Sequence, residues 1–414
     1  MVREYSTRVR KLTEKAQAFM SASGSSKLNW GKSGRLASAA AAAHIQHKKA
    51  SIDASTNQLS LHQLEKAIFG EEEEPLTDLE DSVDPRKRHI RRVPDTYKSN
   101  GHPTPQIMES LEREMTQLVN SANRVTFDNF DFAKNCKSKT TDIPKDVKVW
   151  DDDQPRIAVS ADGIEIAAYF PNAVKSNAQK RTVQDLLDFA ATVPPSEHQT
   201  RMSQNKPDSI YKKVPNQLHG EHRLVRGWHA LGQKGIDKFG PCADTVKNFN
   251  AVMKLKLKLQ LLFHRVNVLM KTLDPTHFQD AQKLKKDLMD LHPAYAALAN
   301  EETDILVYDG LEVLWNVWSQ LHCDHQDPTF SWAVLCIFGG TFTGGYLYMP
   351  NLGLRVRMQP GDIIFIKGRV IRHCVEEWTG GQRISIPIFT HTSVWKMVKE
   401  LAERLQPDEA TDDN

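Results

Sequence analysis

The sequence has few cysteines, no long apolar run and almost no net charge. Five cysteines occur in 414 residues and none forms a C-x-x-C pair, which argues against a disulfide framework and against a thiolate zinc site. We therefore expect a reducing compartment and no disulfides. No segment approaches the roughly 18 consecutive apolar residues of a membrane span, and the first residues lack the apolar core of a secretory signal. These absences predict an intracellular protein without a membrane partner.

The charge balance excludes a general affinity for nucleic acid. The net charge is +2 with 26% charged residues, so contacts to phosphate would have to come from local basic patches. One such patch is "PRKRHIRR" at residues 85–92, which is typical of a nuclear import signal or a phosphate-binding arm, with a solvated linker as the alternative. Its candidate backbone-contacting residues are Arg86, Lys87, Arg88, Arg91 and Arg92.

Composition divides the chain. Residues 1–100 contain the low-complexity tracts "SASGSSKLNWGKSG" and "ASAAAAA" among short amphipathic segments, which predicts a partly disordered helical region. Order is expected from about residue 101, because Thr104-Pro105 is a helix-start signal and Asp162-Gly163 is a favoured hairpin turn between two strands. We interpret residues 401–414 as an acidic tail.

Helical periodicity is concentrated between residues 182 and 300. Residues 182–190 and 274–292 are predicted helices. The segment 244–271 is ambiguous because "KLKLKLQ" alternates like a strand, but its wider apolar spacing favours a helix. Lysines and one arginine would fall along one side of that helix. They are Lys247, Lys254, Lys258 and Arg265. Lys254 and Lys258 could contact a phosphate backbone, although such a stripe is also typical of a solvated face.

Short apolar and aromatic runs punctuated by glycine begin after about residue 304. The runs are "ILVYD", "VLWNVW", "WAVLCIF", "GYLYMP", "DIIFIK" and "RISIPIF". Such a density of strand signals is typical of a sandwich or a closed double sheet.

Two overlapping copies of one pattern follow the second of these runs, His322-Cys323-Asp324 and His325-Gln326-Asp327. On a strand, the first and third residues of a copy project to the same side. An imidazole and a carboxylate placed together are two of the three ligands of the Fe(II) facial triad, and His373 is a candidate for the third. Spacing does not choose between the copies. The alternation that leads up to Asp324, and Pro328 directly after the second copy, favour His322, Asp324 and His373 as the metal ligands.

The last strand predicts an anion site. One face carries Arg383, Ser385, Phe389 and His391, and the other carries Ile384, Ile386 and Ile388. A buried face with an unpaired arginine is costly unless a carboxylate docks on it, and the planar fork of Arg383 suits a carboxylate, to which Ser385 can add a hydroxyl hydrogen bond. An exposed polar face is the alternative, and Pro387 suggests an edge strand or a bulge.

These motifs together resemble the Fe(II)- and 2-oxoglutarate-dependent dioxygenases. They are His322-x-Asp324, "GGTFTGGYLYMP", "PGD" at 360–362, His373 and Arg383-x-Ser385. The ten-residue step from His373 to Arg383 is similar to that of the TET/JBP branch, which oxidises methyl groups on bases in nucleic acid. The resemblance covers about residues 305–395.

The resemblance implies a fold and its cofactors. The fold would be α+β, a double-stranded β-helix, or jelly roll, flanked by helices, within a domain of residues 101–400 that has its helical support at 182–300. The implied cofactors are Fe(II) on His322, Asp324 and His373, together with O2 and with 2-oxoglutarate on Arg383 and Ser385.

The resemblance also implies residues that read a base. The family has an aspartate three residues after the metal-binding aspartate, and an aromatic residue and a histidine six and eight residues beyond the arginine. Here these are Asp327, Phe389 and His391, which would hydrogen-bond to and stack on a flipped base. Asp327 can accept from an exocyclic amine, which cytosine and adenine have and thymine lacks. A further base-contacting asparagine of the family has no position that we can assign.

These interpretations predict a nuclear oxygenase that flips 5-methylcytosine out of double-stranded DNA and oxidises it to 5-hydroxymethyl-, 5-formyl- and 5-carboxylcytosine. The nearest alternative is an N6-methyladenine DNA demethylase of the same mechanism, alone or as a dual activity. An oxygenase of this fold acting on a protein or a small molecule, and a nucleic-acid-binding protein with an inactive iron site, are further alternatives.

Overall fold

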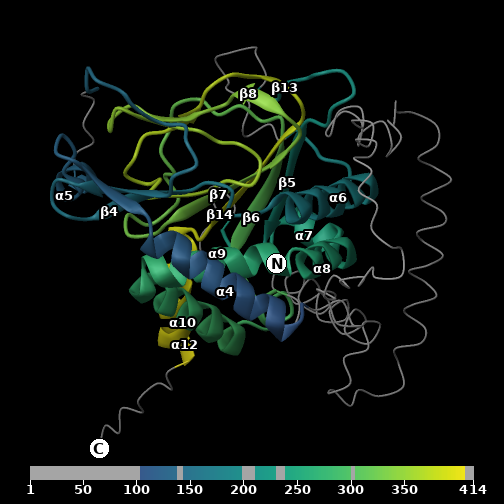
Figure 1. Ribbon diagram of the computed structural model, residues 1–414. Helices are drawn as coiled ribbons and strands as arrows, with labels where there is room; N and C mark the ends of the chain where they lie inside the picture. Colours follow the sequence, from purple (N-terminus) through teal and green to yellow (C-terminus); the bar gives the residue numbers. More distant parts are fainter. Residues whose placement is uncertain (1–102, 138–142, 198–209, 230–237, 300–303, 406–414) are drawn as a thin grey trace, which may run out of the picture.

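The computed structural model describes residues 103–137, 143–197, 210–229, 238–299 and 304–405. A large sheet runs through the centre of this part of the chain, with helices on one side and smaller sheets on the other (Figure 1). The predicted N-terminal region, including the basic cluster at 85–92, lies outside the described residues.

The large sheet has eight strands. In spatial order they are β1 (Asn123–Phe127), β3 (Arg156–Ser160), β4 (Glu165–Phe170), β11 (Ile363–Ile366), β7 (Ala333–Gly339), β14 (Arg383–Phe389), β6 (Gly310–Trp315) and β5 (Gly220–Val225). Neighbouring strands are antiparallel except β1 and β3. β14 therefore lies inside the sheet, between β7 and β6.

A second layer faces one side of this sheet. It consists of β12 (Cys374–Val375), β9 (Leu347–Met349), β10 (Leu354–Val356) and β2 (Lys148–Trp150), with β8 (Phe342–Gly344) and β13 (Trp378–Gly380) as a separate pair. Side chains of both layers, such as Ile337 and Ile364 from the large sheet and Leu347 and Leu354 from the smaller one, share one buried cluster. The double sheet flanked by helices that the sequence predicted is confirmed.

Helices cover the other side of the large sheet. They are α4 (Pro105–Asn120), α6 (Ser176–Thr192), α7 (Ala243–Lys247), α8 (Phe249–Lys258), α9 (Gln260–Leu273), α10 (Pro275–Leu291), α11 (Pro293–Ala296) and α12 (Thr392–Leu405), and the short α5 (Phe132–Lys137) follows β1. Ile384, Ile386 and Ile388 of β14 pack in one cluster with Leu255 of α8 and Phe263 of α9. Each of these isoleucines is 0% exposed, and burial of such a side chain contributes about 1.5–3 kcal/mol.

The position of β14 overturns one prediction. Pro387 lies on a central strand, so the predicted edge is wrong, and the register with each neighbouring strand is the same before and after it. The register with β6 has no partner at Ile386 and Pro387, whereas the register with β7 is continuous. A proline without an N–H is accommodated because the ladder to β6 is interrupted at that point.

Local predictions had mixed outcomes. The hairpin at Asp162-Gly163 is confirmed, with Gly163 at φ +79°. The helix start at Thr104-Pro105 is confirmed, although the Thr104 side chain makes no capping hydrogen bond. The predicted helix over 244–271 is helical but divided into α7, α8 and α9, and "ILVYD" at 305–309 is not a strand.

Three features concern the end of the domain, membrane spans and the cysteines. α12 continues to Leu405, so the acidic tail that we predicted from residue 401 begins inside a helix. Among the described residues, no helix is both long and apolar enough to cross a membrane. All five cysteines are free.

Candidate active site

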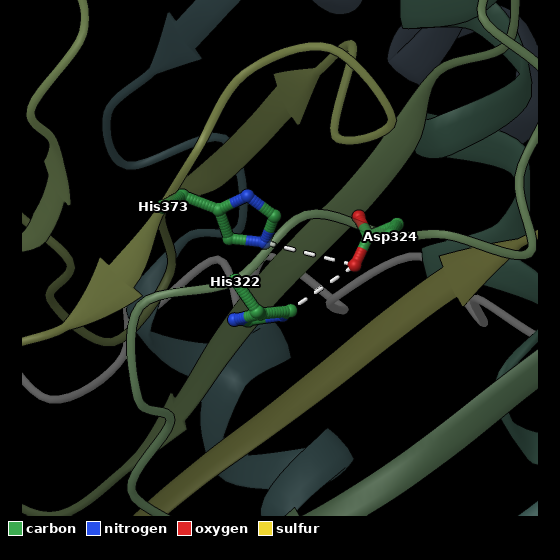
Figure 2. A group of neighbouring side chains, drawn as sticks. All are labelled: His322, Asp324 and His373. Carbon is green, nitrogen blue, oxygen red and sulfur yellow. Dashed lines mark ion pairs between the residues drawn. The ribbon is translucent and has the colours of Figure 1, made fainter. Parts of the chain in front are cut away.

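Three polar side chains meet between the two layers of sheet. His322 Nε2 lies 3.5 Å from Asp324 Oδ1, and His373 Nε2 lies 3.8 Å from the same oxygen. Figure 2 shows the three side chains turned toward one another. One ligand atom from each lies within 4.8 Å of the other two, which is the arrangement that a single metal ion requires.

The backbone places these residues in a way that we did not predict. β6 ends at Trp315, and Asn316 adopts a positive φ of 50°, so no strand alternation reaches His322. Instead His322 and His373 form an isolated antiparallel bridge, with N–H to C=O distances of 3.0 and 2.9 Å. The Asp324 amide donates to the carbonyl of Gly368 at 2.9 Å. The two loops that carry the three residues are therefore tied together by main-chain hydrogen bonds.

Hydrogen bonds also fix which nitrogen of each imidazole can bind a metal. His322 Nδ1 lies 2.7 Å from the carbonyl of Gln320, and His373 Nδ1 lies 3.0 Å from that of Ile371. A carbonyl only accepts, so both Nδ1 atoms carry the proton and both Nε2 atoms keep a lone pair. Metal-binding histidines are commonly oriented in this way.

The surroundings keep the site in the form that a cation needs. Burial raises the pKa of the Asp324 carboxyl, but the imidazoles of His373 and His322 outweigh burial and hold its pKa at about 2. Burial also lowers the pKa of His373, which favours the neutral imidazole. A Cβ at Gly368 would lie 1.9 Å from Asp324 Oδ2, so only glycine leaves room for this carboxylate. Two neutral imidazoles and one carboxylate are the donor set of an Fe(II) facial triad, and the residues fit that metal.

A cavity of about 690 Å³ opens beside the three residues and contains Arg383 and Ser385. Arg383 is 2% exposed, and its Nη1 donates to Ser385 Oγ at 2.5 Å. Its Nε is buried with no hydrogen-bond partner, and no carboxylate among the described residues pairs with the guanidinium. The rings of Trp378 and Phe342 lie 5.2 and 6.0 Å from it. Burial lowers the pKa of Arg383 to about 10, so the group is still a cation at neutral pH.

The three predicted base-reading residues line the same cavity. His391 Nε2 lies 3.8 Å from Asp327 Oδ1. Burial raises the pKa of Asp327 well above its ordinary value, and the charge of Asp324 adds to this, while burial lowers the pKa of His391 to about 4. The ring of Phe389 stacks on His391, with centroids 4.6 Å apart and an interplanar angle of 17°. The structure thus brings Asp327, Phe389 and His391 together, with one face of Phe389 against His391.

Two features of the cavity were missed from the sequence. Trp228, after the end of β5, also stacks on His391, with centroids 5.8 Å apart and an interplanar angle of 25°. Glu312 of β6 also lines the cavity, and its Oε1 is 3.3 Å from Arg223 Nε. The alternation in "GLEVLW" could have revealed Glu312, because Leu311 and Val313 belong to the opposite, helix-covered face.

The second copy of the metal-like pattern has a different environment. His325 is exposed, and Arg369 Nη1 contacts both its carbonyl oxygen at 2.7 Å and its Nδ1 at 3.0 Å. His325 does not belong to the group whose ligand atoms converge.

The predicted backbone contacts of Lys254 and Lys258 are not supported by their positions. Both lie on α8, which packs on the face of the large sheet opposite to the cavity. Lys258 Nζ is held by Asp185 at 2.8 Å and Asp188 at 3.2 Å. Arg265 of the same predicted stripe is buried, with Nη1 on the carbonyl of Leu261. We correct this assignment, because a substrate in the cavity would lie on the far side of the sheet from α8.

Residues 242–392 match the Tet_JBP family model, described as the oxygenase domain of the 2OGFeDO superfamily. This superfamily uses Fe(II), 2-oxoglutarate and O2, and the match supports a dioxygenase enzyme. Tet-like dioxygenase 1 of Naegleria gruberi is 30% identical over 106 residues, which are 25% of this chain. The matched part spans only 33% of the length of that relative.

Solved structures give weaker likenesses. One is described as NgTET1 in complex with 5mC DNA; it has a TM-score of 0.44 and 16% identity, and the match covers 70% of this chain and 91% of that one. A 2OG-Fe(II) oxygenase family protein from Burkholderia pseudomallei has a TM-score of 0.27 and 14% identity, covering 54% of this chain and 82% of that one.

Proposed function

We propose that this chain, whose residues 242–392 match the Tet/JBP oxygenase domain, is an Fe(II)- and 2-oxoglutarate-dependent dioxygenase that oxidises 5-methylcytosine in double-stranded DNA. The observation that carries the proposal is the pairing of two features in one cavity. Three convergent metal ligands lie beside a buried arginine that has no carboxylate partner among the described residues.

The cosubstrate follows from these two features. A dicarboxylate can bind the metal at one end and place its other carboxylate on Arg383, whose fork and neighbouring Ser385 hydroxyl suit that group. With Fe(II), 2-oxoglutarate and O2 bound, the site would supply an oxidant that places one oxygen atom in a substrate C–H bond and the other in succinate, with release of CO2. His322, Asp324 and His373 are the residues that would hold the metal.

The substrate end of the cavity favours a base with an exocyclic amine. A methyl group inside a duplex cannot reach a buried metal, so the nucleotide has to be extruded and held by stacking and by contacts to its pairing edge. Burial, and after it the charge of Asp324, raises the pKa of Asp327, and the carbonyl oxygen of a protonated carboxyl can still accept from the N4 amine of cytosine. His391 can donate to or accept from a ring nitrogen, and Phe389 contributes its aromatic surface.

N6-methyladenine is the second candidate substrate. Its pairing edge also combines an amine with a ring nitrogen acceptor, and the cavity of about 690 Å³ is large enough for either base. Oxidation of its methyl carbon would give a hemiaminal that releases formaldehyde, so the product would be unmodified adenine. The two substrates therefore leave different nucleosides.

The test uses matched duplexes that carry 5-methylcytosine, N6-methyladenine or no modification. We expect succinate formation coupled to loss of 5-methylcytosine and appearance of its oxidised forms, measured by mass spectrometry of the nucleosides. His322→Ala and Asp324→Ala proteins are the controls and should lose both activities together. Oxidation of methylated DNA by these variants at the wild-type rate would refute the assignment of the metal ligands. Succinate formation that no duplex stimulates would point instead to a protein or small-molecule substrate.

We also propose that the protein acts in the nucleus, with the basic cluster at 85–92 as the import signal. The test is the distribution of a fluorescent fusion in cells. A fusion in which Arg86, Lys87, Arg88, Arg91 and Arg92 are replaced by alanine should remain cytoplasmic, whereas an unchanged nuclear signal would contradict this role.

A further inference from the structure

We propose that Trp228 is a positioning residue for base recognition, because its indole fixes the ring plane of His391 and so holds the His391 edge toward Asp327. This inference rests on the proposed function and extends it to a residue outside the motifs of the sequence. Trp228 lies on the segment that follows β5, 163 positions before His391 in the chain.

The orientation of His391 depends on aromatic contacts. Among the described residues its ring makes no hydrogen bond, and the carboxyl oxygen Oδ1 of Asp327 lies 3.8 Å from its Nε2. Phe389 stacks on the ring at 4.6 Å and 17°, and Trp228 stacks on it at 5.8 Å and 25°. Because an imidazole without hydrogen bonds can rotate about its side-chain bonds, these two rings are what restricts its plane.

Phe389 supplies one of the two stacking contacts. It lies against Gly310, where a Cβ would come within 2.7 Å of its ring, so its own position is set by the sheet. Without Trp228 the imidazole would keep this one stacking contact alone, and His391 could turn away from Asp327 into the cavity, which all three residues line.

Trp228 is itself held rigidly. Its backbone pairs in both directions with Gly240, at 3.0 and 3.2 Å. Gly227 lets the chain pass close to Phe239, since a Cβ there would lie 2.5 Å from that ring. Arg226 is buried and paired with Asp304 at 3.3 Å. The backbone is therefore held at Trp228 and at the two residues before it, so Trp228 is suited to hold another ring in place.

Fixing His391 matters because recognition of a flipped base needs several groups at set positions at once. Asp327 and His391 would contact adjacent atoms of one pairing edge, and a displaced imidazole would leave one of those contacts unmade. A misplacement of about 1 Å at a reacting or binding group can reduce turnover about a hundredfold. The loss should fall on the duplex and leave 2-oxoglutarate unaffected, because Arg383 and Ser385 do not depend on Trp228.

The experiment compares Trp228→Leu and Trp228→Phe in the full-length iron-loaded protein. The substrate is the modified duplex on which the wild-type protein is active. Trp228→Leu removes the aromatic face at similar volume and should lower kcat/KM for the duplex about tenfold to a hundredfold, with the KM for 2-oxoglutarate unchanged. Trp228→Phe keeps a planar ring and should retain most of the wild-type kcat/KM for the duplex. A duplex with 2-aminopurine at the target position gives a separate measurement. The fluorescence of this base reports its extrusion from the duplex independently of oxidation.

Trp395→Leu is the matched control. Trp395 of α12 makes an edge-to-face contact with Phe330, with centroids 5.2 Å apart, and does not line the cavity, so its loss tests for a general effect of removing a tryptophan. We expect this variant to keep the wild-type kcat/KM for the duplex.

A wild-type kcat/KM for Trp228→Leu, or an equal loss for Trp228→Phe and Trp228→Leu, would overturn the inference while the proposed function stands. A wild-type protein that oxidises neither methylated duplex would overturn the proposed function and this inference with it.

Discussion

Replacement of Arg383 by methionine should weaken 2-oxoglutarate binding without weakening the fold. The guanidinium is buried, and no carboxylate among the described residues compensates its charge. Its pKa is lowered by burial to about 10, and the difference from the ordinary value of an arginine corresponds to about 3 kcal/mol. At neutral pH the group is charged in the folded and the unfolded protein, so this desolvation cost is present in full. Methionine has a similar length, carries no charge and fits among Met358, Phe342 and Trp378.

When 2-oxoglutarate binds, its carboxylate offsets the desolvation cost of the Arg383 guanidinium. A hydrogen bond to a charged partner contributes about 1.5–3 kcal/mol, so loss of the guanidinium should raise the KM for 2-oxoglutarate between about tenfold and about 150-fold. Steady-state succinate formation measures this KM, and urea unfolding of the protein without metal or 2-oxoglutarate measures stability. The unfolding free energy of Arg383→Met should equal or exceed that of the wild type. Arg383→Lys keeps the charge but not the fork and should have an intermediate KM.

Arg226→Met is the matched control, because Arg226 is equally buried but paired with Asp304 and Asp309. Its removal takes the arginine partner from the buried Asp309, while Asp304 keeps Lys256 at 2.6 Å, and it should reduce the unfolding free energy by about 3–5 kcal/mol. The reasoning about Arg383 is refuted if Arg383→Met is as unstable as Arg226→Met, or if it binds 2-oxoglutarate as tightly as the wild type does.

Three further predictions concern the site and the core. Asp327→Asn should retain iron and lose oxidation of methylated DNA, measured by metal titration and nucleoside analysis; loss of iron would mean that Asp327 is a metal ligand. Gly368→Ala should abolish metal binding, because the new Cβ would meet Asp324 at 1.9 Å, whereas Gly240→Ala, with nothing within 4 Å, should bind metal normally. Burial lowers the pKa of His277 to about 4, so the unfolding free energy should fall as the pH drops from about 6.5 toward 4. His277→Gln should flatten this dependence in urea denaturation at pH 7 and pH 4.5, and an unchanged slope would exclude His277 as its source.

The strand at 383–389 was predictable because its information is local. Alternation with a period of two assigns each residue to a face whatever the partner strands are, and the isoleucines do lie on the helix-covered side while Arg383 and Ser385 face the cavity. The structure brings His322, Asp324 and His373 together, but for a reason other than the strand alternation that we used. A bridge between two loops aligns them, and no strand continues that far.

The remaining features depend on contacts that no local pattern encodes. Trp228 comes near His391 because β5 pairs with β6, and β6 in turn pairs with β14. The rule that places proline on edge strands failed at Pro387 because a central strand can tolerate one interrupted pair. The lysine stripe was predicted from one unbroken helix, but α8 and α9 separate at Leu259, and Arg265 is buried.

The seven residues of β14 contribute side chains to the core on one face and to the cavity on the other. This arrangement limits which mutations the strand tolerates. A substitution on its cavity side changes one contact and leaves the isoleucines on the other side where they are. Deletion of a single residue in the strand would instead turn every downstream side chain over, sending isoleucines into the cavity and polar groups into the core. Substrate preference in descendants of this chain can therefore drift one residue at a time, while the length of this strand has to stay constant.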